Sequence, residues 1–172
     1  MESELRREQI LNMISEQISP ISASSLAKML NVSRQVIVGD IALLRAKGHE
    51  IIATARGYIV PSFRESNSYL GKVACRHARA DTLNELYTIV DLGATVVNVI
   101  VEHKLYGEIT GGLNLTDRKD VDVFIEKAEL SNIRLLSELT MEVHLHTIAC
   151  NDKVHFEQIC KALEDNGYLF KN

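Results

Sequence analysis

The chain has 172 residues, 46% of them hydrophobic, and this length suits two small globular domains better than one minimal module. No apolar run approaches the roughly 20 residues that a membrane-spanning helix needs, so we expect no membrane association. Three widely separated cysteines without a CxxC spacing exclude a disulfide framework and a zinc finger, and predict buried free thiols at Cys75, Cys150 and Cys160.

The N-terminal segment MESELRREQI carries charges of both signs and no apolar core, which is not the pattern of a signal peptide. We therefore expect a cytoplasmic protein. The net charge of −4 is unevenly distributed, because residues 1–60 carry a net charge of +1 and the acidic surplus lies in residues 61–172. The first part can therefore gather basic side chains on one face, as nucleic-acid binding requires. These are Arg6, Arg7, Lys28, Arg34, Arg45, Lys47 and Arg56.

Helical spacing dominates the first fifty residues. Residues 4–18 predict one amphipathic helix, which includes Ile18 and which a Ser-Pro pair ends, because the residue before proline avoids the helical conformation. Residues 23–30 predict a second, shorter helix. A tight turn then leads to Ser33, a favourable N-cap residue, and a third helix is expected from residue 34 to about 47. This order of elements is typical of a helix-turn-helix.

Two short strands follow, at residues 50–53 and 57–60, and make the motif a winged helix-turn-helix. In this motif the start of the third helix meets base edges in the major groove, whereas more distant basic side chains contact phosphate. The alternative is a three-helix docking module without a role on DNA. We expect base contacts from Ser33, Arg34, Gln35 and Val38, and phosphate contacts from Lys47 and Arg56.

The remainder of the chain mixes helical and strand periodicity. Residues 61–72 are polar and lack a period, so they predict a linker, with a DNA-binding domain at 1–62 and a regulatory domain at 63–172. Interleaved helices and strands predict an α/β sandwich-like regulatory domain, and an α+β protein overall. The expected helices lie near 83–90, 121–128 and 154–163, and Thr116 or Asp117 is the expected N-cap of the second. The expected strands lie near 94–101, 106–115 and 141–149.

The HxH pattern in the last predicted strand is the most informative feature of this domain. Alternate side chains of a strand share a face, so His144 and His146 point the same way with their Cα atoms about 6.5–7 Å apart. Two imidazoles at that distance can share a transition-metal ion. The alternative is a pair of ordinary strand histidines. A stable metal site needs further ligands, for which the candidates are His77, Glu85, Glu142, His103 and His155.

Two further segments carry a resemblance to a known family. LYGEITGGLNLTDRKDVDVFIEKAE, followed by EVHLHTI, resembles the 3H domain. Joined to the winged helix-turn-helix, the chain from about residue 5 to 170 resembles the NiaR-type niacin-responsive repressors of NAD biosynthesis and niacin uptake. It departs from that family at Gly39, where a glutamine is expected in the recognition helix, and after His103, where a proline is common.

The resemblance implies a metal-binding regulatory domain, nicotinic acid as co-repressor and a homodimer on palindromic double-stranded operator DNA. Carried over by position, the metal ligands are His77, Glu85, His144 and His146. The ion would be a divalent transition metal, with nickel and zinc first and iron as a further candidate. Two rival functions are a regulator that senses the metal itself and a metal-dependent hydrolase. We find no separate general base or nucleophile pairing in the sequence, and therefore predict that the chain is not an enzyme.

Overall fold

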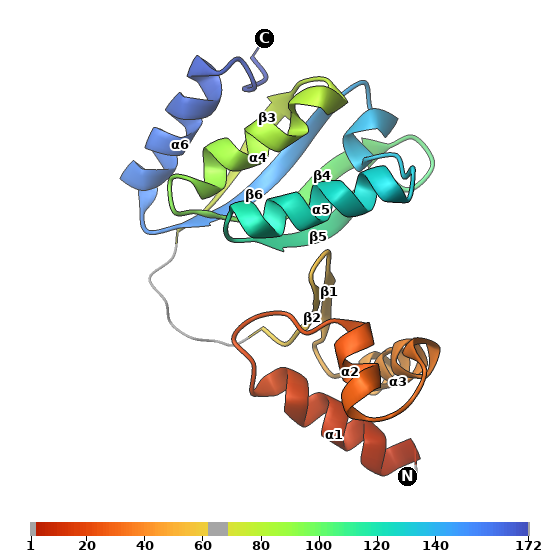
Figure 1. Ribbon diagram of the computed structural model, residues 1–172. Helices are drawn as coiled ribbons and strands as arrows, with labels where there is room; N and C mark the ends of the chain where they lie inside the picture. Colours follow the sequence, from red (N-terminus) through yellow and green to blue (C-terminus); the bar gives the residue numbers. More distant parts are fainter. Residues whose placement is uncertain (1–2, 62–68, 172) are drawn as a thin grey trace. The chain divides into compact units, whose positions relative to one another are not determined.

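The computed structural model describes residues 3–61 and 69–171 (Figure 1). The chain divides into two compact units, Met1–Arg64 and Glu65–Asn172. The predicted domain boundary after residue 62 lies outside the described residues. Within the described part of the chain, no helix is long and apolar enough to span a bilayer.

The first unit contains three helices and a two-stranded hairpin. Ser33 caps the third helix as predicted, because its hydroxyl accepts a hydrogen bond from the Val36 amide at 3.3 Å. Ser22 caps the second helix in the same way through the Ser25 amide. The elements are α1 (Ser3–Ser15), α2 (Ala23–Met29), α3 (Arg34–Ala46), β1 (Ile52–Thr54) and β2 (Gly57–Ile59).

A single apolar core holds these helices together. Ile10 and Ile14 of α1 meet Leu26 of α2 and Ile41 of α3, and all four side chains are buried. Burial of each such side chain stabilises the fold by about 1.5–3 kcal/mol. The predicted extension of the first helix to Ile18 is wrong. α1 ends at Ser15, and Ile18 lies beyond it with 77% of its surface exposed.

The predicted wing is confirmed as an antiparallel hairpin in which Ile52 pairs with Ile59. Tyr58 extends the pairing to Ile21, because the amide of each residue donates to the carbonyl of the other at 2.9 Å. Gly57 makes this close approach feasible, since a Cβ there would lie 2.3 Å from the Ile21 carbonyl oxygen. The wing is therefore tied directly to the segment that precedes α2.

The second unit is built on a four-stranded antiparallel sheet with the order β3-β6-β4-β5. Asp117 is the N-cap of its second long helix, which selects one of the two predicted residues. The elements are β3 (Tyr69–Arg76), η1 (Arg79–Asp81), α4 (Thr82–Val90), β4 (Thr95–His103), β5 (Gly107–Leu115), α5 (Arg118–Leu130), η2 (Leu136–Leu139), β6 (Val143–Cys150) and α6 (Lys153–Asp165).

The predicted linker over residues 61–72 is wrong at its C-terminal end. Residues 69–72 belong to β3, which pairs along its whole length with β6. Gly71 obscures the strand pattern in the sequence. The Phe156 ring of α6 packs against this glycine so closely that a Cβ on residue 71 would lie 2.3 Å from a ring carbon. A residue without a side chain gives no hydrophobic signal, although its backbone is buried in the sheet.

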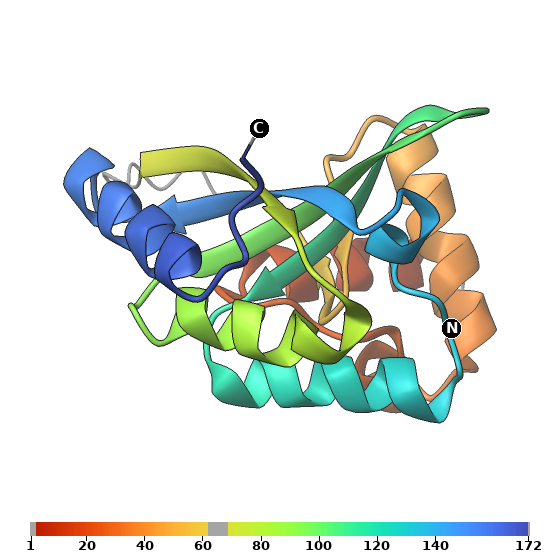
Figure 2. The same ribbon diagram turned by 90° about the horizontal axis from the view of Figure 1, so that it is seen from above.

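One face of the sheet is covered by helices, with α4 and α5 below it in Figure 2 and α6 packed on β3 and β6. Along β6 the side chains alternate as predicted, and every second residue is buried. His144 and His146 are on the buried set, together with Ile148. The prediction that both histidines lie on one face of their strand is thus confirmed, and this face is the one that the helices cover.

Candidate metal centre

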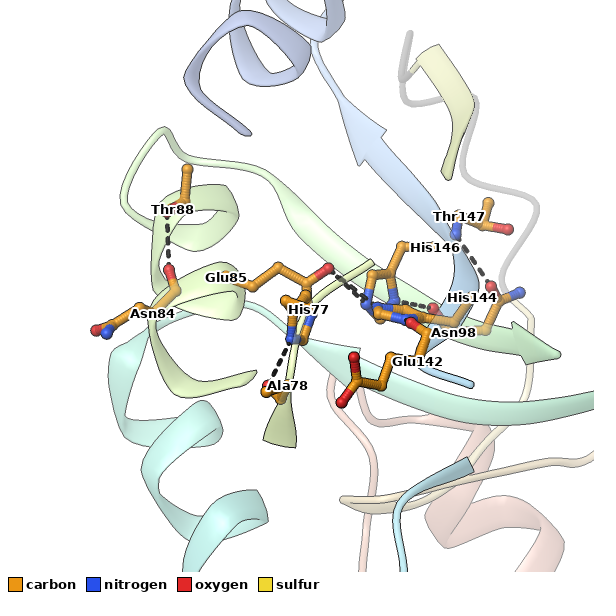
Figure 3. A network of polar contacts seen from close by, with 10 residues as sticks. All are labelled: His77, Ala78, Asn84, Glu85, Thr88, Asn98, Glu142, His144, His146 and Thr147. Carbon is orange, nitrogen blue, oxygen red and sulfur yellow. Dashed lines mark hydrogen bonds and ion pairs between the residues drawn. The ribbon is translucent and has the colours of Figure 1, made fainter. Parts of the chain in front are cut away.

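The predicted ligands of the second unit converge from three elements, as Figure 3 shows. His77 follows the end of β3, Glu85 lies on the inward face of α4, and His144 and His146 lie on the helix-covered face of β6. Antiparallel pairing sets Cys75 of β3 opposite His144, which brings the segment leading to His77 beside the two strand histidines. All four predicted ligands are buried, and the Glu85 side chain has no solvent exposure.

Glu85 is the common neighbour of the three imidazoles. Its Oε2 lies 2.8 Å from His77 Nε2, and its Oε1 lies 3.2 Å from His144 Nε2 and 3.3 Å from His146 Nε2. The rings themselves are adjacent, with a distance of 4.9 Å between the centroids of His77 and His144 and also between those of His144 and His146. Three imidazole nitrogens and one carboxylate therefore surround a single small volume.

Each imidazole is held by its other nitrogen. His77 Nδ1 is 2.9 Å from the Ala78 carbonyl, and His144 Nδ1 and His146 Nδ1 are each 2.8 Å from a carbonyl oxygen, of Glu142 and Asn98 respectively. A carbonyl can only accept, so Nδ1 of every ring carries the proton. In the neutral rings, the lone pair of each Nε2 is then directed at Glu85. This is the tautomer that metal ligation through Nε2 requires.

Local irregularities of the backbone provide two of these carbonyls. β4 has a register shift between Val96 and Asn98, and the Asn98 carbonyl accepts from His146 while its side-chain Oδ1 accepts from the Thr147 amide at 3.1 Å. Before β6, Met141 and Glu142 both have positive φ, of 51° and 71°, which is uncommon for residues with side chains. Asn98 was missed in the sequence, where a polar residue inside a run of valines is the signal that marks it.

The electrostatics of the cluster follow from burying one carboxylate among three imidazoles. Burial alone raises the pKa of Glu85, but the imidazoles that face it outweigh this effect and hold that pKa well below its usual range. Burial lowers the pKa of His77 and of His146, and the Glu85 carboxylate more than compensates, so both pKa values are raised. The cluster thus keeps a negative charge in a buried position when positive charge, on the imidazoles or on a bound cation, lies beside it.

Two atoms of the cluster are buried without a hydrogen bond. His77 Nε2 and Glu85 Oε2 approach each other to 2.8 Å, yet the contact lacks hydrogen-bond geometry and each atom is without a hydrogen-bond partner among the described residues. An unpaired polar atom is costly to bury, and native structures rarely leave one. Imidazole and carboxylate are ordinary ligands of nickel, zinc and iron. The donor set and its two unsatisfied atoms fit a divalent transition-metal ion.

A thiol also reaches this cluster. Ligand atoms of Cys75, Glu85 and His144 all lie within 4.8 Å of one another, and all three residues are buried, so this group could hold a metal ion. The free thiol itself was predicted, and so was its burial. Its place among the candidate ligands was missed, because only the pairing of β3 with β6 reveals it.

The other candidates from the sequence are engaged elsewhere. Glu142 contributes its carbonyl to His144 Nδ1. His103 Nδ1 accepts from the Leu105 and Tyr106 amides in the β4–β5 turn. His155 Nε2 lies 2.7 Å from the Leu92 carbonyl. The ring nitrogens of His103 and His155 thus contact the backbone, Glu142 contributes only its carbonyl, and none of the three side chains is a neighbour of Glu85 in the cluster.

In the first unit, the start of α3 is open to solvent. Arg34 and Gln35 are exposed there, whereas the Ser33 hydroxyl is used as the cap and Val38 is half-buried against the core. Lys47, at the other end of α3, pairs with Glu4 at 2.9 Å, and both side chains are largely exposed. Arg56 lies in the turn of the wing, where its amide donates to Thr54 Oγ1. Arg34 and Gln35 are therefore the predicted base-contacting residues that α3 exposes to solvent without another described role.

The basic face expected from the sequence is smaller than predicted. Arg6 Nε lies 2.6 Å from Asp40 Oδ2, and Arg7 Nη1 lies 3.5 Å from Oδ1 of the same carboxylate. Asp40 is buried on the inward face of α3. These two arginines therefore neutralise an acidic residue of the recognition helix instead of facing solvent.

Comparison with known proteins agrees with both units. An HTH domain model matches residues 6–59, and a 3H domain model matches residues 71–172. The chain is 43% identical over 169 residues to the transcription repressor NadR of Bacillus subtilis (strain 168), covering 97% of this chain and 94% of that protein. The chain belongs to the NadR/NiaR family of transcription repressors. It is also 39% identical over 166 residues to the probable transcription repressor NiaR of Thermotoga maritima, covering 96% of this chain and 94% of the relative.

Membership of the NadR/NiaR family decides between the alternatives that the sequence left open for the first unit. A helix-turn-helix domain in a family of repressors indicates DNA binding, so a docking module without a role on DNA is set aside. The relatives are repressors, which confirms the prediction that the chain is not an enzyme. The hydrolase alternative is set aside for the same reason.

Proposed function

We propose that this repressor controls genes of NAD biosynthesis and niacin uptake in the bacterial cytoplasm, and that nicotinic acid is its co-repressor. The effector would bind at or beside a divalent transition metal, nickel or zinc before iron, held by His77, Glu85, His144 and His146. The observation that carries this proposal is the convergence of three Nε2 atoms on one buried carboxylate, with two atoms of the group outside any hydrogen bond among the described residues.

The residues of the cluster perform separate tasks in this proposal. The Ala78, Asn98 and Glu142 carbonyls orient the rings, so that each Nε2 keeps its lone pair for a ligand bond. Glu85 supplies negative charge that offsets the charge of a divalent ion in a buried position. A metal bound there supplies a Lewis-acidic position that a carboxylate or a pyridine nitrogen can occupy, and nicotinic acid carries both groups.

In this proposal a homodimer binds the operator, and its two recognition helices enter successive major grooves. Base contacts would come from Ser33, Arg34, Gln35 and Val38, with Lys47 and Arg56 on phosphate. Half-sites would then lie about 34–36 Å apart, or a multiple of that distance. The effector must bind the DNA-competent arrangement better than the other one, because only differential affinity shifts the equilibrium.

Two measurements on the full chain test the proposal. Calorimetry of nicotinate binding, before and after removal of metal with a chelator, is expected to show binding only to the metal-loaded protein. Gel-shift titrations on operator DNA are expected to show tighter binding with nicotinate than with nicotinamide, which lacks the carboxylate. Equal nicotinate affinity after metal removal would contradict a role for metal in effector recognition. DNA affinity that follows metal alone would favour the metal-sensing alternative.

A further inference from the structure

We propose that Cys75 is an additional metal ligand, and that its sulfur gives this centre a mixed nitrogen, oxygen and sulfur donor set. This inference rests on the proposed metal site and extends it by one residue. It concerns which atoms hold the ion and which ions the site prefers.

The geometry places the thiol inside the cluster. Cys75 and His144 are direct partners in the pairing of β3 with β6, so their side chains stand next to each other on one face of the sheet. A ligand atom of each lies within 4.8 Å of the other and of a Glu85 carboxylate oxygen. Opposed ligands of one ion with bonds of about 2.0–2.3 Å are separated by about 4–4.6 Å, so small side-chain rotations suffice.

The surroundings of Cys75 leave its sulfur facing the carboxylate. The residue has no solvent exposure, and burial, followed by the nearby Glu85 charge, raises the pKa of its thiol. The next ligand along the chain, His77, has a buried Nε2 without a hydrogen-bond partner. Cys75 and His77 therefore flank the last residue of β3, and a ligand atom of each lies near the Glu85 carboxylate.

Sulfur would change the chemistry of the site. Thiolate is a soft ligand that favours zinc and copper(I), whereas a purely imidazole and carboxylate site discriminates less against harder ions. We therefore expect Cys75 to raise the affinity of the centre for zinc and nickel relative to its affinity for manganese and magnesium. The other two thiols are outside the group, since Cys150 contacts the Tyr69 and Asp152 carbonyls and Cys160 lies half-buried on α6.

Cobalt(II) substitution tests the assignment in the full chain. The cobalt protein is expected to show a thiolate-to-metal charge-transfer band in the near ultraviolet. Cys75→Ser should abolish this band while keeping the weaker visible bands of bound cobalt, and Cys160→Ser should retain both. Circular dichroism of each metal-free variant checks folding. A charge-transfer band that survives in Cys75→Ser would overturn the inference.

A second measurement uses the unmodified protein, so it does not depend on the folding of a variant. X-ray absorption at the metal edge of the zinc-loaded chain is expected to show a sulfur neighbour at about 2.3 Å besides lighter atoms at about 2.0–2.2 Å. Bound zinc with nitrogen and oxygen neighbours only would refute the role of Cys75 and leave the proposed metal site intact. Failure to bind zinc, nickel or cobalt at all would refute both.

Discussion

Glu85 Oε1 lies 3.2 Å from His144 Nε2, although 59 positions separate the two residues in the chain. The contact joins α4 to β6 across the helix-covered face of the sheet. A donor set assembled from such distant positions exists only in the folded chain. Occupation of the site must therefore stabilise the fold of the second unit, because the unfolded chain cannot offer the same ligands together.

Metal removal should accordingly lower the thermal stability of the protein. A ligand present at 100 times its Kd stabilises by about 2.7 kcal/mol, so the metal-loaded chain is expected to unfold at a higher temperature than the chelated one. Glu85→Gln keeps the shape of the side chain but removes its charge, and should lose most of this difference. Calorimetric scans with and without zinc provide the measurement.

Glu126→Gln is the matched control for that experiment, since Glu126 is an exposed glutamate on α5. It should respond to zinc like the unmodified protein. A Glu85→Gln variant with an unchanged response to zinc would show that the carboxylate is not a ligand.

Glu142→Gly should preserve metal binding. The structure uses the carbonyl of this residue and not its carboxylate, and glycine keeps the carbonyl while adopting a φ of 71° without strain. We expect a zinc affinity within about threefold of the unmodified protein, well short of the about 10–100-fold loss that follows when a ligand loses its hydrogen-bonded support. Competition against a metal-binding dye measures this affinity. A loss as large as that of Glu85→Gln would make Glu142 a ligand.

Arg34→Ala should weaken operator binding by about 1–3 kcal/mol and relax the preference for operator over unrelated DNA. The reason is the position of Arg34 on the first, exposed turn of α3, where a guanidinium can bind a guanine edge through two hydrogen bonds. Fluorescence anisotropy with operator and scrambled duplexes measures both quantities. Arg45→Ala, at the far end of the same helix, serves as control and should affect both duplexes equally. An equal loss on both duplexes for Arg34→Ala would assign it to phosphate.

Lys47→Ala should instead weaken binding to all sequences and reduce the salt dependence. A side chain that contacts one phosphate displaces about one counterion, so the slope of log K against log salt should fall by about 1. Lys47 must first leave Glu4, its exposed partner in this structure. Lys153→Ala on α6 is the matched control, because Lys153 is also an exposed lysine and forms an ion pair with Glu157. An unchanged slope for Lys47→Ala would place Lys47 away from the DNA backbone.

Gly39→Ala should stabilise the first unit by about 1 kcal/mol, because glycine in the interior of a helix is unfavourable relative to alanine. Gly39 is exposed, and a Cβ there would meet nothing within 4 Å among the described atoms. Gly57→Ala is the opposite case, since its Cβ would collide with the Ile21 carbonyl, and should destabilise the wing. Urea denaturation of the two variants should therefore shift in opposite directions. A destabilised Gly39→Ala would reveal a contact absent from the structure.

The first unit was predicted almost completely because its signals are local. The cap at Ser33, the spacing of Ile37 and Ile41, and the short hairpin all depend on residues a few positions apart. What was not predictable is the pairing of Arg6 and Arg7 with Asp40, which depends on how α1 crosses α3. A count of basic residues cannot anticipate that two of them are occupied by a buried carboxylate.

In the second unit, periodicity identified the helices and the histidine strand but not β3. Its buried backbone at Gly71 carries no side chain, so the alternation that marks a strand is broken. The four predicted ligands lie together, whereas Cys75 was interpreted only as a buried thiol. Its proximity to His144 follows from the strand register, which a single sequence does not specify.

The orientation of all three imidazoles depends on main-chain oxygens, at Ala78, Asn98 and Glu142. A substitution changes a side chain and leaves its carbonyl in place, so point mutations cannot delete these acceptors one by one. Only a change in the path of the chain could misalign the rings. The side chains of Ala78 and Glu142 can therefore vary during evolution while the oxygens that orient the ligands stay in place.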